Sequence, residues 1–278
     1  MSRPKLLAAL AVLSTFAGMA RGAEILAPDL IINGLSQDEL SINWWNWMIS
    51  YPAGSNPSTD STGEFAYLGA DQTPAPHPGV FFLAGDLGNP GVRSVTILPG
   101  QVLFFPLITV ISPIPLFGAD EAAVRLDAAD TVGTVTELFV RIDGVDAALP
   151  PGIASLLDLH RLSPPGTFPW TVPADNIFGV DEGTYESVLD SYWVALAPLA
   201  AGGTYELHFH GAGTGTPPLY GPYVYDQTYI ITVVPEPGSV VLLGIGAGLG
   251  LLGVGRRKAR PASPRCASQK ESGPPSGG

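Results

Sequence analysis

Short apolar runs separated by glycine and proline are the feature that most limits how this chain can fold. The 278 residues include 34 glycines and 28 prolines. Runs of this kind, rich in β-branched and aromatic residues, predict β-strands, and the intervening glycines and prolines predict the turns that join them. The strands are expected at residues 80–84, 94–98, 102–111, 134–143, 192–196, 204–210 and 223–234.

Helices are expected at only two places. Ser36 and Glu39 have the S-x-x-E spacing of a capping box and predict a helix over residues 36–50. Its spacing of apolar residues predicts one buried face. That face consists of Leu40, Trp44, Trp47 and Tyr51, with Trp45 and Met48 beside it. A second, short helix is expected over residues 120–127.

The order of these elements favours a mainly β fold. Helices do not alternate with strands, which argues against a parallel α/β sheet. We expect an antiparallel β-sandwich, jelly-roll-like, with the short Trp-rich helix at its N-terminal end. Residues 145–190 carry the least regular pattern and are expected to form long loops.

Charge is distributed unevenly along the chain. Residues 24–234 contain 23 acidic residues, no lysine and only four arginines, which gives a net charge of −19. A domain this acidic repels nucleic acid and anionic lipid. Two interpretations remain open: the charge keeps an exported domain soluble, or it binds divalent cations. The single cysteine, Cys266, lies outside this region, so the domain contains no disulfide bond.

Residues 1–23 predict a secretory signal peptide. Arg3 and Lys5 are followed by an apolar stretch over residues 6–20. Small residues favour cleavage after Ala20, and cleavage after Ala23 is the alternative. The expected partners at this end are the Sec machinery and signal peptidase, and residues 24–234 are the exported domain.

The C-terminal end predicts a membrane anchor. After the tripeptide Pro235-Glu236-Pro237 comes an uncharged stretch of 18 residues, 238–255, which is long enough to span a bilayer. A basic cluster follows at once, consisting of Arg256, Arg257, Lys258 and Arg260. The positive-inside rule keeps this cluster in the cytoplasm, so the acidic domain faces outward. Residues 261–278 are rich in proline, serine and glycine and predict a disordered tail.

This C-terminal order resembles the PEP-CTERM sorting signal, which here covers residues 235–260. The resemblance implies that an exosortase, a membrane-embedded cysteine protease, cuts the chain near residues 235–237. It also implies a Gram-negative-type bacterium that makes exopolysaccharide. The protein would pass through an inner-membrane-anchored intermediate and then reach the cell surface or the extracellular matrix.

The exported domain carries a second resemblance. Its Trp-rich helix and residues 56–63, 80–85, 97–106, 142–144, 192–199 and 208–211 are together similar to a family of uncharacterised secreted bacterial and archaeal proteins. This resemblance covers most of residues 35–233. It implies one coherent domain and carries no known activity or catalytic residue.

His208 and His210 are the strongest candidates for metal binding. Residues two apart on a strand share a face, so both imidazoles can reach one ion. The site also needs a further ligand, and His77 and His160 are the other two histidines of the chain. The alternative is that both histidines are exposed or bonded to loop carbonyls.

Trp44 and Trp45 are candidates for stacking against a sugar, and the alternative is that they pack against a sheet. No G-x-S-x-G nucleophile motif and no EF-hand pattern occurs in the sequence. We therefore expect an exported surface or matrix protein that is not an enzyme and needs no cofactor. The alternatives are an exopolysaccharide-binding module and a metal-dependent enzyme that uses His208 and His210.

Overall fold

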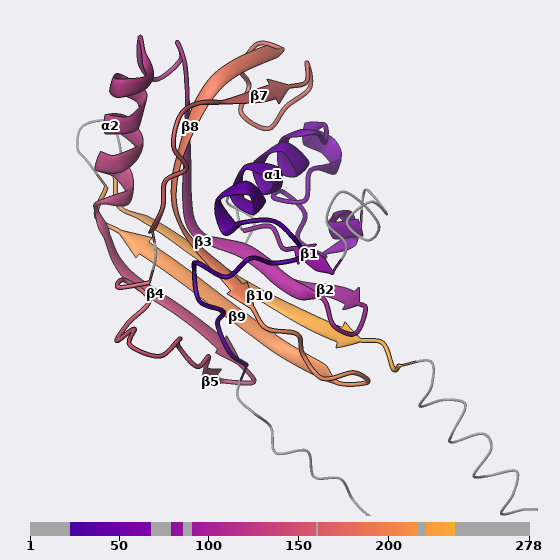
Figure 1. Cartoon of the computed structure of the whole chain (residues 1–278). Helices are drawn as coiled ribbons and strands as arrows, with labels where there is room; N and C mark the ends of the chain where they lie inside the picture. Colours follow the sequence, from indigo (N-terminus) through magenta and orange to yellow (C-terminus); the bar gives the residue numbers. More distant parts are fainter. Residues whose placement is uncertain (1–22, 68–78, 86–90, 160, 216–220, 237–278) are drawn as a thin grey trace, which may run out of the picture. The chain divides into compact units, whose positions relative to one another are not determined.

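The computed structural model describes residues 23–67, 79–85, 91–159, 161–215 and 221–236 (Figure 1). The chain divides into two compact units, Met1–Pro235 and Glu236–Gly278. All helices and strands described below belong to the first unit. The expected leader up to residue 22, the apolar segment 238–255, the basic cluster and the tail lie outside the described residues. Within the described residues, no helix has the length and apolar character needed to cross a membrane.

Two five-stranded sheets form the body of the first unit, which confirms the expectation of a mainly β fold with few helices. The first sheet has the order β1-β3-β8-β6, and β7 also pairs with β8. Its strands are β1 (Val80–Phe82), β3 (Val102–Pro113), β6 (Arg161–Leu162), β7 (Phe168–Val172) and β8 (Gly183–Leu196). The second sheet has the order β2-β10-β9-β4-β5. Its strands are β2 (Val92–Ile97), β4 (Val135–Ile142), β5 (Val145–Asp146), β9 (Thr204–Gly213) and β10 (Tyr223–Val233).

Two strand pairs depart from the expected antiparallel arrangement. β1 pairs with β3 in parallel, and β2 pairs with β10 in parallel. Between β1 and β3 the chain crosses to the other sheet to form β2, so it returns to the first sheet in its original direction. A direct turn joins antiparallel neighbours, whereas parallel neighbours need such a crossover.

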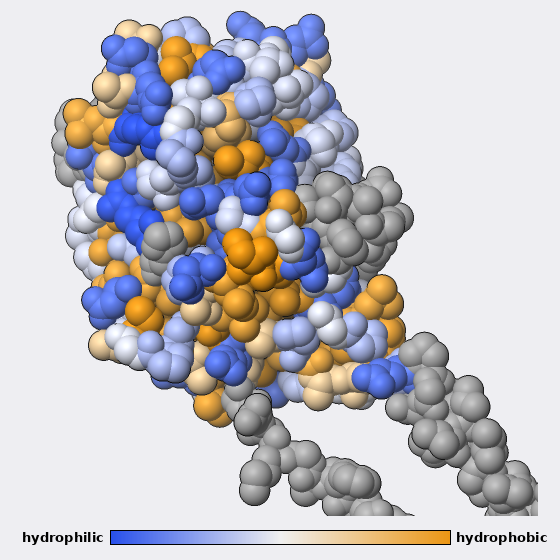
Figure 2. Space-filling model, viewed as in Figure 1, coloured by the Kyte–Doolittle hydropathy of each residue, from blue (hydrophilic) through white to orange (hydrophobic). Residues whose placement is uncertain are grey.

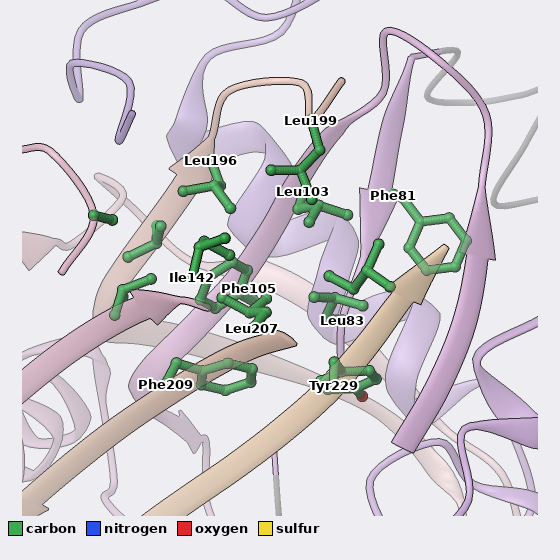
Figure 3. Packing of buried hydrophobic residues seen from close by; sticks show 14 of the residues in the cluster. Phe81, Leu83, Leu103, Phe105, Ile142, Leu196, Leu199, Leu207, Phe209 and Tyr229 are labelled. Atoms are coloured by element: carbon green, nitrogen blue, oxygen red, sulfur yellow. The ribbon is translucent and has the colours of Figure 1, made fainter. Parts of the chain in front are cut away.

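The two sheets pack face to face over a shared apolar core. Phe81, Leu103 and Phe105 come from the first sheet, and Leu207 and Tyr229 come from the second. Figure 3 shows these side chains pointing toward one another between the strands. All five are at most 1% exposed. Burying each large apolar side chain contributes about 1.5–3 kcal/mol, so this core is a major source of stability in a domain without disulfides.

Helix α1 (Gln37–Ile49) covers the other face of the first sheet (Figure 1). The predicted capping box is present, because the Ser36 hydroxyl accepts from the Glu39 N–H and the Glu39 carboxylate accepts from the Ser36 N–H. The buried face differs slightly from the predicted one. Trp47 and Tyr51 are only partly buried. The buried apolar residues are Leu40, Trp44, Trp45, Met48 and Ile49.

Helix α2 (Glu121–Val132) extends the predicted short helix by about one turn. Asp120 caps its N-terminus by accepting from the Ala123 N–H. Val124 and Ala128 pack against Val188 of β8. Farther along β8, the same face of the first sheet packs against the second sheet. The described residues also form two short 3-10 helices, η1 (Ala53–Ser55) and η2 (Glu64–Tyr67).

The expectation of long loops over residues 145–190 was wrong for part of this region. It contains β5, β6, β7 and the first half of β8. The first residues of β8 alternate between exposed polar side chains and partly buried ones, and they pair with β7. Glycine and glutamate are disfavoured in strands and weaken the local pattern there, so the pairing with β7 is what shows the strand.

The face of the molecule shown in Figure 2 mixes hydrophilic and hydrophobic residues, with one hydrophobic patch near its middle. Scattered apolar residues on a surface are normal and need no functional explanation. A candidate binding site therefore has to come from a cavity or from a cluster of polar groups.

Candidate functional site

A cavity of about 520 Å³ lies beside β3. This volume is within the range of small-ligand and peptide pockets. The cavity touches every residue of β3 from Pro106 to Ile111. Its other walls include residues of α1, of α2, of β7 and the segment that follows it, of β9 and of the start of β10.

The cavity exists because β3 is much longer than its neighbour β1. β1 pairs only with Val102–Phe104, whereas β8 pairs with β3 as far as Pro113. A β-bulge between Pro106 and Ile108 then reverses which residues face each side of the sheet. Beyond the bulge, one edge of β3 has no neighbouring strand among the described residues.

One wall of the cavity is aromatic. Trp45 of α1 donates its indole N–H to the Thr109 hydroxyl of β3 at 2.9 Å. Trp45 also packs edge-on against Trp170, at 6.4 Å between ring centroids, and its ring is tilted against Phe178 at 6.1 Å. Trp170 is 2% exposed, and its indole Nε1 has no hydrogen-bond acceptor within the described part of the chain.

The opposite wall is partly polar. The Tyr223 hydroxyl donates to the Thr131 carbonyl and also bonds the Thr134 hydroxyl, each at 3.2 Å. Burial raises the pKa of Tyr223 above its ordinary value, although the bond to Thr134 opposes this shift. The phenol therefore stays neutral near pH 7. Asp127 is the one charged side chain among the described lining residues, and it accepts from the Ser112 hydroxyl at 2.6 Å.

The predicted stacking residues Trp44 and Trp45 both line this cavity. They are 3% and 5% exposed, so neither presents an open ring on the outer surface. Trp44 donates its indole N–H to the Leu83 carbonyl at 2.8 Å and packs edge-on against Trp193 at 5.4 Å. Their main contacts are therefore within the layer between α1 and the first sheet.

The predicted metal pair lies elsewhere, on the outer face of the second sheet. His208 and His210 share a face of β9, as the strand period requires, and both contact Asp226 of β10. His208 Nε2 lies 2.7 Å from one carboxylate oxygen, and His210 Nδ1 lies 3.1 Å from the other. Burial tends to raise the pKa of Asp226, but the bonds from both imidazoles outweigh it and hold the pKa below its ordinary value.

The surroundings of this cluster bear on its chemistry. Phe139 of β4 stacks on the His210 ring at 4.8 Å, and the Arg141 guanidinium lies 4.3 Å from the centre of the same Phe139 ring. Within the described residues, no group of three or more His, Cys, Asp or Glu side chains is placed to hold a metal ion. His77 and His160 lie outside the described residues. The cluster joins two imidazoles through one carboxylate, and metal binding stays a prediction.

Part of the predicted sorting motif can be placed. Pro235 and Glu236 are exposed and lie outside regular structure, directly after β10, whereas Pro237 is outside the described residues. Val234 N–H donates to the Ile97 carbonyl at 3.0 Å, the last such bond of the sheet in the described chain.

Sequence reasoning missed the cavity and the role of Asp226. The cavity combines Trp45, Val110 and Tyr223, which lie far apart in the chain and carry no shared local pattern. Asp226 had a usable signal, because β9 and β10 are consecutive strands and form a hairpin. Pairing them in register places Asp226 directly opposite His210.

Comparisons of this chain with protein-family models, with curated proteins and with solved structures found no match. The interpretation of the chain therefore depends on its sequence and on the geometry described above.

Proposed function

We propose that this is an exported, non-catalytic protein of the cell surface or extracellular matrix, delivered by a signal at each end of the chain. The exported domain begins near residue 24, and an exosortase separates it from the apolar segment near residues 235–237. In this proposal the basic cluster 256–260 holds the uncut intermediate in the inner membrane of a Gram-negative-type bacterium.

The observation that carries the proposal is that the second sheet ends just before the sorting motif. Near the beginning of the described chain, Leu26 N–H donates to the Ala195 carbonyl of β8, and Ile25, 1% exposed, belongs to the core. At the other end the sheet stops at Val234, and exposed Pro235 and Glu236 follow. A cut near residues 235–237 therefore removes no residue of either sheet or of the described core.

The finer description of the fold is also part of the proposal. We infer that the two packed sheets form a jelly-roll-like sandwich suited to display outside the cell. The shared core between the sheets supports this inference. The acidic, lysine-free composition also supports it, since a strong net charge keeps an exposed domain soluble.

Substitution of the sorting motif tests this proposal in the native organism. Replacing Pro235, Glu236 and Pro237 by alanine is expected to stop processing, so the full-length chain accumulates in the membrane fraction. The matched control replaces Ser272, Gly273 and Pro274 of the tail by alanine and leaves processing unchanged. Equal release of the exported domain from the motif variant and the unaltered protein would contradict the proposal.

A further inference from the structure

We propose that the open edge of β3 binds a basic, extended peptide segment of another polypeptide as an added strand. The open edge is the side of residues 107–112 that faces away from β8. This inference does not depend on how the protein is sorted, because it is drawn from the cavity and the sheet alone.

The backbone of the open edge has hydrogen-bonding groups to offer. Ile114, directly after β3, donates its N–H to the Glu186 carbonyl of β8. Residues alternate in direction along a strand, so Ile108, Val110 and Ser112 also point their backbone groups toward β8. Thr109 and Ile111 therefore point theirs to the other side, where the described residues provide no partner strand.

The cavity lies on both faces of this edge, which is the arrangement an added strand needs. Thr109 and Ile111 face the layer of α1, where Trp45 and Trp170 form the wall. Val110 faces the opposite side, toward α2. Successive side chains of an extended peptide point to opposite faces, so they enter the two halves of the cavity in turn.

Charge complementarity specifies the peptide. One half of the cavity is aromatic and apolar, so it accepts an apolar side chain. The other half contains Asp127, for which the described part of the chain provides no ion pair. A lysine or arginine on the alternate face of the peptide reaches this carboxylate, and the net charge of −19 on residues 24–234 favours a basic partner.

A second copy of this domain does not supply such a strand. Residues 24–234 contain no lysine, and their four arginines have other roles. Arg93 is fully buried, and Arg125, Arg141 and Arg161 form ion pairs with Glu121, Asp146 and Asp190.

The test uses the purified full-length protein and a fluorescein-labelled peptide, Val-Lys-Val-Lys-Val-Lys-Val. Fluorescence anisotropy is expected to show saturable binding. Peptides with N-methylated valines, which cannot form a strand, are expected to bind at least tenfold more weakly. On addition of the peptide, amide hydrogen exchange at Thr109 and Ile111 is expected to slow at least tenfold, while exchange at Val110 stays the same.

Two charge variants separate a specific site from general attraction. Asp127→Asn is expected to weaken binding about tenfold, whereas Glu206→Gln, an equal charge change on the exposed outer face of the second sheet, has little effect. Equal effects of the two variants would overturn the proposal. The absence of saturable binding would also overturn it. So would equal affinity for the N-methylated peptides, which is the result expected of a pocket for small apolar molecules. Slow amide exchange at Thr109 in self-associated protein without peptide would overturn it as well.

Discussion

At the scale of single residues, one buried cation organises the region between the two sheets. Arg93 of β2 is 0% exposed, and its guanidinium donates to the carbonyls of Ala84 and Ser58 and to the Tyr229 hydroxyl. Hydrogen bonds from a charged donor are each stronger than those between neutral groups. The Arg93 side chain thus joins three segments: the end of β1, the loop after η1, and strand β10.

Asp60 has a complementary role in the same region, and it gives a pH-dependent prediction. It is 6% exposed and accepts from the Thr62 N–H and hydroxyl and from the Phe65 N–H. Burial tends to raise the pKa of Asp60, but these bonds and nearby Arg93 together hold it below the ordinary value.

The sign of the pH effect follows from this shift. Because the pKa of Asp60 is lower in the folded state than in the unfolded state, its contribution to stability is complete above the unfolded pKa and is lost as the pH falls below about 4. Asp60→Asn is expected to lower the free energy of unfolding near pH 7 and to flatten its decline in acid. Urea unfolding at several pH values measures this. The exposed Asp29→Asn variant is the control, and an unchanged acid slope in Asp60→Asn would contradict the assignment.

At the scale of elements, the sequence predicted those structures whose signal is local. The capping box of Ser36 and Glu39 placed the start of α1 correctly, because both hydrogen bonds are formed by residues three apart. The long apolar run of β3 was also recognised. The first half of β8 was missed, since its stability comes from pairing with β7 and not from its own composition.

The candidate site was harder to predict for a physical reason. Its geometry depends on the bulge in β3 and on the shortness of β1, neither of which is marked by a motif. The two histidines were predicted to share a face of the strand, and they do. Their contact with Asp226 could not be predicted in the same way, because it depends on the register between β9 and β10. Local patterns indicate elements, and register and packing decide which side chains meet.

A tight contact between the two sheets near the bulge predicts the effect of a substitution in β9. Gly211 faces β3, and an added Cβ would lie 2.7 Å from the Leu107 carbonyl oxygen and from Ile108 Cγ1. Gly211→Ala is therefore expected to force the sheets apart and to lower the free energy of unfolding by about 1–3 kcal/mol. Gly54→Ala is the control, because a Cβ there meets no atom within 4 Å. Equal stability of the two variants in urea would show that the sheets do not pack as described.

At the scale of the whole molecule, the second sheet ends just before the expected sorting motif. The last described hydrogen bond of the sheet is donated by Val234, and the net charge changes from negative in residues 24–234 to positive in the segments before and after them. An acidic domain lies between them, and basic residues lie in the two ends. The end of the sheet and the change of charge both fit a C-terminal cut near residues 235–237, whereas charge alone bears on the expected N-terminal cut.

Intact-mass measurement of the protein recovered from cells and from the medium tests this account most directly. The account predicts a mature chain that begins at Arg21 or Glu24 and ends near Pro235. Recovery from the medium of a chain that still carries the tail with Cys266 would contradict it.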